Sequence, residues 1–251
     1  EEEEAGSGEH RNAKLYFTLG LFVLSVVLLG SGAYLLFRAE EDGRVVSEIA
    51  VEGNAYYTDQ EVLELTDLSI NRSIRAAELG RLRSRLLMLP AIVDFSWKRE
   101  GSRLILSVVE RECAAIVRTG LSEELLFEID YDLFIISENK VRCKNVPLVS
   151  GDFERSLDRF RDMTLYQLLA GFRSLKTEHP EMASRISEMR PGPAGELSLF
   201  TMAGARMELA GGLDSRNIKR LYAAFAFMEQ EKKFRGVFDL RGADVLYVPG
   251  I

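Results

Sequence analysis

Residues 15–37 are 23 consecutive residues without a charged side chain, in a chain in which 28% of all residues are charged. The polar side chains of this run include Thr18, Ser25, Ser31 and Tyr34, which can hydrogen-bond within a helix or lie near a membrane surface. At about 1.5 Å per residue, such a helix spans roughly 34 Å, more than the ~30 Å hydrocarbon core of a bilayer. The run therefore predicts a transmembrane helix over residues 15–37.

The basic residues that flank this run predict its orientation. Arg11 and Lys14 precede it and Arg38 follows it, so the positive-inside rule favours a cytoplasmic tail at residues 1–14 and an exported remainder. The prediction is a single-pass protein of the inner membrane. A cleaved signal peptide is the alternative, because residues 31–33 form a small-x-small triplet, but the apolar run continues past this triplet and is longer than a usual signal core.

The overall charge argues against nucleic acid as a partner. The chain has 32 Lys and Arg against 39 Asp and Glu, a formal net charge of −7, whereas binding to a phosphate backbone requires a basic face. The two cysteines, Cys113 and Cys143, lack the close spacing of metal ligands. A disulfide between them and a pair of buried free thiols both stay open.

No catalytic motif is present in the sequence. There is no phosphate-binding loop, zinc-protease motif, nucleophile elbow or calcium loop. The acidic pairs Glu110 with Glu112 and Glu123 with Glu124 are typical of solvated strand or turn residues rather than of acid–base dyads. We therefore predict a non-enzymatic protein with no cofactor, metal or small-molecule substrate.

The first half of the predicted exported part has a β-α-α-β-β order. A strand at 45–52 is followed by a capping box that begins at Thr58, and a Leu-striped helix at 75–87 follows the first helix. The last two strands, at 92–98 and 104–109, flank a glycine-containing turn.

The second half predicts a mixed α/β domain built on a largely antiparallel sheet. The predicted elements are strands at 114–118, 125–129 and 133–136, a loop from 146, a helix at 164–177, strands at 197–201 and 206–209, a helix at 214–233, and strands at 237–241 and 245–248. The apolar face of the last helix is predicted to comprise Ile218, Leu221, Tyr222, Phe225 and Met228. The fold class is thus α+β.

Several of these segments, taken in order, resemble one bacterial family. The segments are IAVEGN at 49–54, YTDQEV at 57–62, LPAIVDFSWKR at 89–99, LILSVVERECA at 104–114, VPLVSG at 146–151 and VFDLR at 237–241. They are similar to the polypeptide-transport-associated (POTRA) domain and the following β domain of the FtsQ/DivIB cell-division proteins. The family's D-x-x-G turn differs here, because Asp132 or Leu133 stands in place of its glycine.

The resemblance implies a POTRA domain at 45–112 and an FtsQ-type β domain at 113–251. It also implies a bitopic scaffold of the division septum that binds FtsB-like and FtsL-like proteins and helps recruit or regulate septal peptidoglycan synthesis. The family contacts FtsB by strand addition near its C-terminal end. The alternative is a membrane-anchored POTRA protein that handles exported polypeptides, but the single POTRA module and the absence of barrel-like strands favour division.

The last predicted strand is the candidate binding site. Val245, Leu246, Tyr247 and Val248 end the sequence pattern, and a terminal strand often forms a sheet edge that can accept a partner strand. The alternative is that these residues simply complete the sheet. Arg241, in the VFDLR segment, is predicted to form a structural salt bridge.

Overall fold

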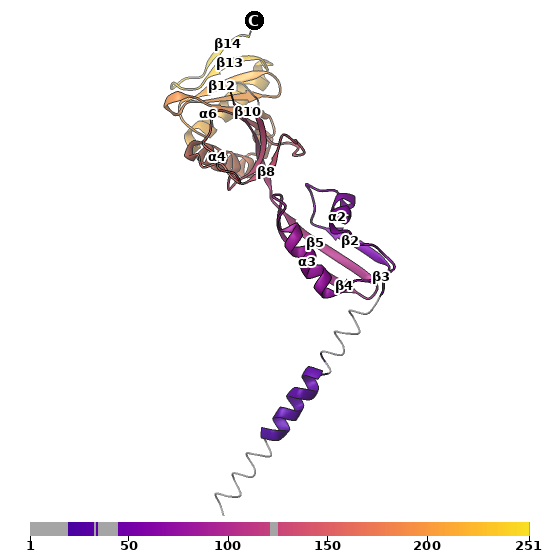
Figure 1. Ribbon diagram of the computed structural model, residues 1–251. Coiled ribbons are helices and arrows are strands. Elements are labelled where there is room, and N and C mark those ends of the chain that lie inside the picture. The colour runs from indigo at the N-terminus through magenta and orange to yellow at the C-terminus, as the bar shows by residue number, and fades with distance from the viewer. Residues whose placement is uncertain (1–19, 33, 35–44, 121–124, 251) are drawn as a thin grey trace, which may run out of the picture. The chain divides into compact units, whose positions relative to one another are not determined.

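The structure is a computed structural model that describes residues 20–32, 34, 45–120 and 125–250 (Figure 1). The chain falls into two compact units. The first comprises Glu1–Glu52, Asp59–Leu86 and Phe95–Ser107, and the second comprises Gly53–Thr58, Leu87–Asp94 and Val108–Ile251. Each unit is described separately below.

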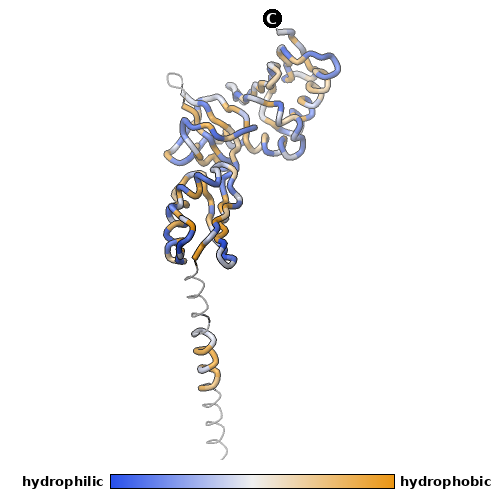
Figure 2. The backbone as a smooth tube through the Cα atoms, turned by 90° about the vertical axis from the view of Figure 1, so that its right-hand side faces the viewer, coloured by the Kyte–Doolittle hydropathy of each residue, from blue (hydrophilic) through white to orange (hydrophobic). Residues whose placement is uncertain are grey.

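The membrane-spanning helix predicted for residues 15–37 is corrected by the structure. Residues 20–32 are helical and largely apolar (Figure 2). No helix in the described part of the chain is long and apolar enough to cross a membrane. The predicted location, as a single-pass protein of the inner membrane, is therefore not supported either. The predicted tail at 1–14 lies outside the described residues, as do residues 15–19, 33 and 35–37.

The first unit is built around a three-stranded sheet in the order β2-β5-β4, with β2 parallel to β5. Its elements are β1 (Val45–Val46), β2 (Glu48–Glu52), α2 (Asp59–Thr66), β3 (Arg72–Ser73), α3 (Ala76–Leu86), β4 (Ile92–Glu100) and β5 (Arg103–Glu110). Strands β1 and β3 pair separately. The helices bury Val62, Leu79, Leu82 and Leu86, as the 3.6-residue spacing of their apolar residues requires. The predicted β-α-α-β-β order of the main elements is confirmed.

The second unit contains a nine-stranded sheet in the order β14-β13-β12-β11-β10-β9-β6-β7-β8. Its strands are β6 (Cys113–Thr119), β7 (Leu125–Asp130), β8 (Ile135–Glu138), β9 (Leu148–Ser150), β10 (Ile186–Pro191), β11 (Leu197–Thr201), β12 (Ala205–Leu209), β13 (Gly236–Asp239) and β14 (Leu246–Val248). Three neighbouring pairs, β6 with β9, β9 with β10 and β12 with β13, are parallel. The sheet is therefore mixed.

Helices α4 (Met163–Glu178), α5 (Pro180–Ala183) and α6 (Ser215–Glu231) pack with the sheet around one core. The two long helices begin at aspartate caps: Asp162 accepts from the Leu165 amide at 3.0 Å, and Asp214 accepts from the Asn217 amide at 2.8 Å. The predicted apolar face of α6 is buried except for Tyr222, which is 60% exposed. The assignment of Tyr222 to the apolar face is therefore wrong.

Two strands of the second sheet were not predicted. Strand β9 lies between β6 and β10 and is parallel to both, at a position where the sequence predicted a loop. Strand β10 also has no counterpart among the predicted elements. A strand of three residues such as β9 is too short for an alternating pattern to emerge, and its pairing is decided by neighbours distant in sequence.

The state of the two cysteines is decided by the structure. Cys113 on β6 and Cys143 on the β8–β9 connection form a disulfide, with a Cα–Cα distance of 6.3 Å across a sequence separation of 30. This bond fastens the connection to the sheet.

The turn after β7 places a leucine in a backbone conformation that usually favours glycine. Leu133 has φ +66°, the left-handed region that usually favours glycine, at a cost of about 1–2 kcal/mol. Its side chain is only 5% exposed in the core, and burying a leucine contributes about 2 kcal/mol. Asp130 Oδ1 supports the turn by accepting from the amides of Asp132 at 3.0 Å and Phe134 at 2.8 Å.

Segments that carry the family resemblance meet in the second unit. Glu110 accepts hydrogen bonds from three loop amides, those of residues 55, 56 and 57. The next residue, Arg111, donates to the Pro90 carbonyl at 2.9 Å and to Asp130 at 2.8 Å. A Cβ on Gly53 would lie 2.3 Å from the Val108 carbonyl oxygen, and its φ is +82°. The quoted motif residues thus have structural roles in holding the 53–58 loop.

Candidate partner-binding edge of the sheet

Strand β14 forms one edge of the nine-stranded sheet. It pairs antiparallel with β13, placing Val248 opposite Val237, Tyr247 opposite Phe238 and Leu246 opposite Asp239. No other strand among the described residues pairs with it. Three of the four predicted site residues therefore lie in the edge strand, and Val245 directly precedes it.

The side chains of β14 alternate between solvent and core. Leu246 is 62% exposed and Val248 is 58% exposed, on the face of the sheet opposite Tyr247. Val245 is 37% exposed. Two apolar side chains in water beside an unpaired strand edge form a short surface to which an extended peptide can bind.

Tyr247 anchors the strand from its inner face. Its ring centroid lies 4.9 Å from that of Phe238 and 6.1 Å from that of Phe227, and Lys233 Nζ lies 5.2 Å from the ring centre. The phenol donates to the Arg235 carbonyl at 3.0 Å. Because these contacts are all on one side, the edge itself stays uncovered by them.

Gly236 allows β14 to approach β13. Its φ is +109°, and a Cβ there would lie 2.5 Å from the Val248 carbonyl oxygen and 2.9 Å from the Tyr247 ring. No other residue type fits this backbone without moving the edge strand.

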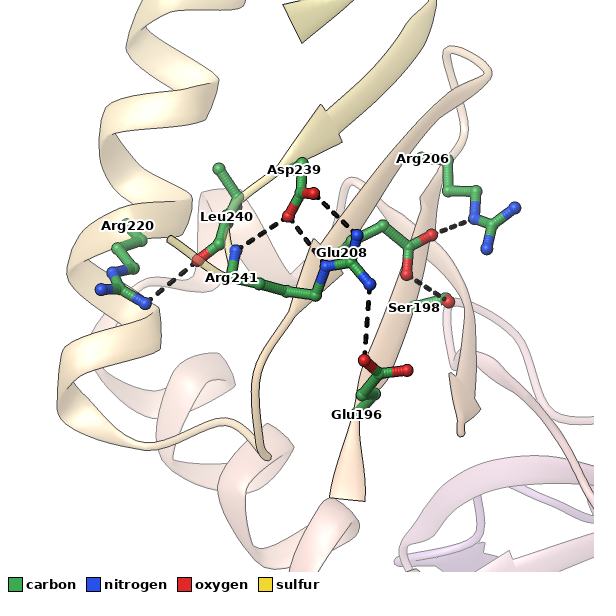
Figure 3. Close-up of polar contacts among 8 residues, drawn as sticks. All are labelled: Glu196, Ser198, Arg206, Glu208, Arg220, Asp239, Leu240 and Arg241. Carbon is green, nitrogen blue, oxygen red and sulfur yellow. Dashed lines mark hydrogen bonds and ion pairs between the residues drawn. The ribbon is translucent and has the colours of Figure 1, made fainter. Parts of the chain in front are cut away.

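The turn between β13 and β14 begins with a salt bridge. Arg241 donates through Nε at 2.9 Å and Nη2 at 2.7 Å to the two carboxylate oxygens of Asp239, and its Nη1 lies 3.4 Å from Glu196 (Figure 3). The predicted salt-bridge role of Arg241 is confirmed. Hydrogen bonding from Arg241 lowers the pKa of the Asp239 carboxyl to about 2, and the pKa of Arg241 is raised by the same partner.

Neighbouring polar contacts fix the strands behind the edge. Ser198 donates to Glu208 at 2.8 Å, Glu208 also pairs with Arg206, and Arg220 on α6 donates to the Leu240 carbonyl at 3.0 Å (Figure 3). These contacts position the end of β13, from which the chain turns into β14.

The opposite edge of the sheet, β8, is partly covered by a loop. The Ile135 amide donates to the Asp158 carbonyl at 2.9 Å, Phe134 forms an isolated bridge with Arg159, and the Phe160 amide donates to the Leu133 carbonyl at 3.0 Å. Covering an edge in this way prevents pairing with another chain. Of the two edges, β14 is the one that remains open.

The chain matches no protein-family model and no curated protein. The geometry of the sheet edge is therefore the basis for assigning a function.

The described residues provide no alternative site for a metal. Within them, no group of three or more His, Cys, Asp and Glu side chains could hold an ion. Glu110, a member of the first acidic pair considered from sequence, accepts hydrogen bonds from loop amides. The second pair, Glu123 and Glu124, lies outside the described residues. His179, on the loop before α5, lies 3.9 Å from Glu181 and beside Tyr222 at the surface.

Sequence reasoning missed several residues that shape the edge. Gly236, Phe238 and Phe227 decide how β14 is held. Gly236 directly precedes the VFDLR segment and Phe238 lies within it, but the sequence did not assign this role to either residue. The available signal was the glycine at the start of a predicted strand, where it often marks a close approach of another backbone.

Proposed function

We propose that this chain is a non-enzymatic scaffold protein of the bacterial division machinery, which binds an extended segment of an FtsB-like or FtsL-like partner along β14. The resemblance of the quoted segments to the FtsQ/DivIB proteins supports the division role. The observation that carries the binding role is the asymmetry of the sheet in the described part of the chain, in which β8 is partly covered by a loop and β14 pairs only with β13.

The partner segment added to β14 would be a strand with apolar residues at alternate positions. On the outer face, its side chains would lie beside Leu246 and Val248, which are more than half exposed in the free chain. Main-chain hydrogen bonds would supply affinity, and these two side chains would supply register. On the inner face, Tyr247 already packs against Phe227 and Phe238. Recognition of the partner therefore depends on the outer face.

The first experiment measures co-purification of the FtsB-like protein with variants of the full chain. Val248→Lys places a charge in the proposed apolar contact, and Tyr247→Pro removes a main-chain donor from the edge. Both are expected to abolish co-purification. Leu157→Lys is the matched control, because Leu157 is fully exposed in the 151–162 loop. Thermal melting of Val248→Lys separates loss of binding from loss of folding.

A second experiment tests the division role in cells. Depletion of the chain should produce filaments, and the wild-type gene and Leu157→Lys should both restore septation while Val248→Lys should not. Normal septation after depletion would overturn the division role. Restoration by Val248→Lys, with unchanged partner binding, would overturn β14 as the interface.

A further inference from the structure

A second surface, on α3 of the first unit, has a charge opposite to that of the chain as a whole. Residues 72–85 contain five arginines and a single acidic residue, Glu78, a local charge of +4 in a chain of −7. The arginines are Arg72, Arg75, Arg81, Arg83 and Arg85. No lysine occurs in this segment.

Three of the arginines have structural partners. Arg72 pairs with Glu78 at 2.5 Å, Arg83 donates to the Phe95 carbonyl at 3.0 Å, and Arg85 lies 3.5 Å from the Thr66 carbonyl. Arg75 and Arg81 are exposed, and among the described residues neither has an ion-pair partner. Their guanidinium groups are available to a ligand.

The position of Arg75 is unfavourable for the helix itself. Its carbonyl accepts from the amides of Glu78 at 3.0 Å and Leu79 at 3.2 Å, so it occupies the N-terminal capping position of α3. Asp, Asn, Ser and Thr are preferred there because their side chains bind free amides, and a cation near this end opposes the helix dipole. Arg75 therefore does not serve helix stability.

Two adjoining hollows run along this helix. One, of about 360 Å³, is lined by Arg72, Ser73, Arg75, Ala77, Glu78 and Arg81. The other, of about 510 Å³, is lined by Glu78, Arg81, Leu82, Ser84 and Arg85. Glu78 and Arg81 border both hollows, and Arg75, Arg81 and Arg85 each line at least one of them; we call this surface the arginine groove.

We propose that this arginine groove binds an acidic polypeptide segment of a partner protein. Arginine forks bind carboxylates in bidentate fashion, which a lysine cannot do. From Arg81 to Arg85 the helix rises about 6 Å, which matches carboxylates four residues apart on a helix or two apart on a strand, where the rise is ~6.6 Å. The groove lies on the first unit and is independent of β14.

Other anionic partners fit the surface less well. A nucleic acid would meet a chain of net charge −7, which repels a long polyanion. A membrane-binding helix presents bulky apolar side chains beside its basic ones, whereas Leu79, Leu82 and Leu86 of α3 are buried in the unit. A short acidic segment avoids both difficulties.

The test uses fluorescence anisotropy with the full chain and two labelled peptides of equal charge. One is a ~16-residue Glu-Ala-Ala-Ala repeat, with carboxylates four residues apart, and the other has the same composition with its glutamates adjacent. The spaced peptide should bind saturably and more tightly than its isomer. Arg75→Asp and Arg81→Glu should each weaken its binding at least tenfold, while Lys219→Glu, on the exposed face of α6, should leave it unchanged.

Arg75→Asp separates binding from folding. The aspartate supplies a preferred cap, so the melting temperature should stay the same or rise while affinity falls. Absence of saturable binding, equal binding of the two peptides, or equal weakening by Lys219→Glu would each overturn the proposal. Binding to vesicles of phosphatidylglycerol that is lost in the arginine variants, without peptide binding, would assign the groove to lipid instead.

Discussion

The two ends of the nine-stranded sheet differ in how far an acidic side chain is buried and in how many donors surround it. At the β7 end, Glu128 is 1% exposed and is surrounded by donors. At the β13 end, Asp239 binds one exposed arginine. The first carboxylate is part of the core structure, and the second is a surface contact beside an open edge.

The β7 end is closed by contacts from several segments. Glu128 accepts from the Arg142 and Cys143 amides through one oxygen and from Tyr56 and Ser137 hydroxyls, both at 2.7 Å, through the other. Burial, together with this carboxylate, raises the pKa of the Tyr56 phenol to about 12. The disulfide of Cys143 holds the same connection in place.

Among the described residues, nothing covers the β14 end in a comparable way. Its edge strand has three residues, and the contacts that hold it are the Tyr247 ring, the Gly236 approach and the turn with Arg241. Contacts from several segments thus hold one end of the sheet, and few contacts hold the other end, where we propose that a partner strand is added. The following substitutions test this difference between the two ends of the sheet.

The largest effect is expected from removing the disulfide. Replacing Cys113 and Cys143 together by Ser should lower the free energy of unfolding by about 4 kcal/mol, because a crosslink across 30 residues restricts the unfolded chain. Urea denaturation measures the loss. Binding of the partner at β14 should persist in the folded fraction. An equal loss of partner affinity in the folded protein would show that the two ends are coupled.

Glu128→Ala should have the next largest effect. Four donors lose a buried acceptor, which we expect to cost about 3 kcal/mol in the free energy of unfolding. Glu138→Ala on the exposed end of β8 is the control and should change stability by less than about 0.5 kcal/mol. Equal effects of the two changes in chemical denaturation would refute the structural role of Glu128.

Gly236→Ala should act locally at the open end. The new methyl group would collide with the Val248 carbonyl in a backbone that favours glycine, so β14 should detach at a cost of about 2 kcal/mol. Hydrogen exchange at the β14 amides that are bonded to β13 should accelerate, and partner binding should fall. Gly242→Ala is the matched control, because a Cβ there has room. Slow exchange in Gly236→Ala would contradict the role of this approach.

The smallest effect is expected for Asp239→Asn, and it depends on pH. The pKa of Asp239 is about 2 in the folded chain against about 3.9 in the unfolded chain. The contribution of the Asp239–Arg241 pair to the free energy of unfolding is therefore complete above about pH 4 and is lost as the pH falls towards 2. Asp239→Asn should reduce the pH dependence of the free energy of unfolding across this window. The difference should be largest at low salt, because the pair is exposed. Parallel urea midpoints for both proteins from pH 5 to pH 2 would exclude the contribution.

Local patterns were sufficient for many elements. The stripes of α3, α4 and α6 and the alternation in β5 and β11 follow from side-chain periodicity, which the chain carries within each segment. The edge position of β14 was expected because the pattern ends there. The transmembrane helix was inferred from an uncharged run alone, and no helix among the described residues is long and apolar enough to support it.

The sequence by itself determined the order of the main helices and strands, the aspartate caps and the apolar faces, because these depend on residues a few positions apart. Tertiary structure alone decided that β9 lies between β6 and β10, that Cys113 bonds Cys143, and that among the described residues β8 is partly covered while β14 pairs only with β13. These features depend on backbone hydrogen bonds and close approaches between segments distant in sequence, which leave no pattern within either segment.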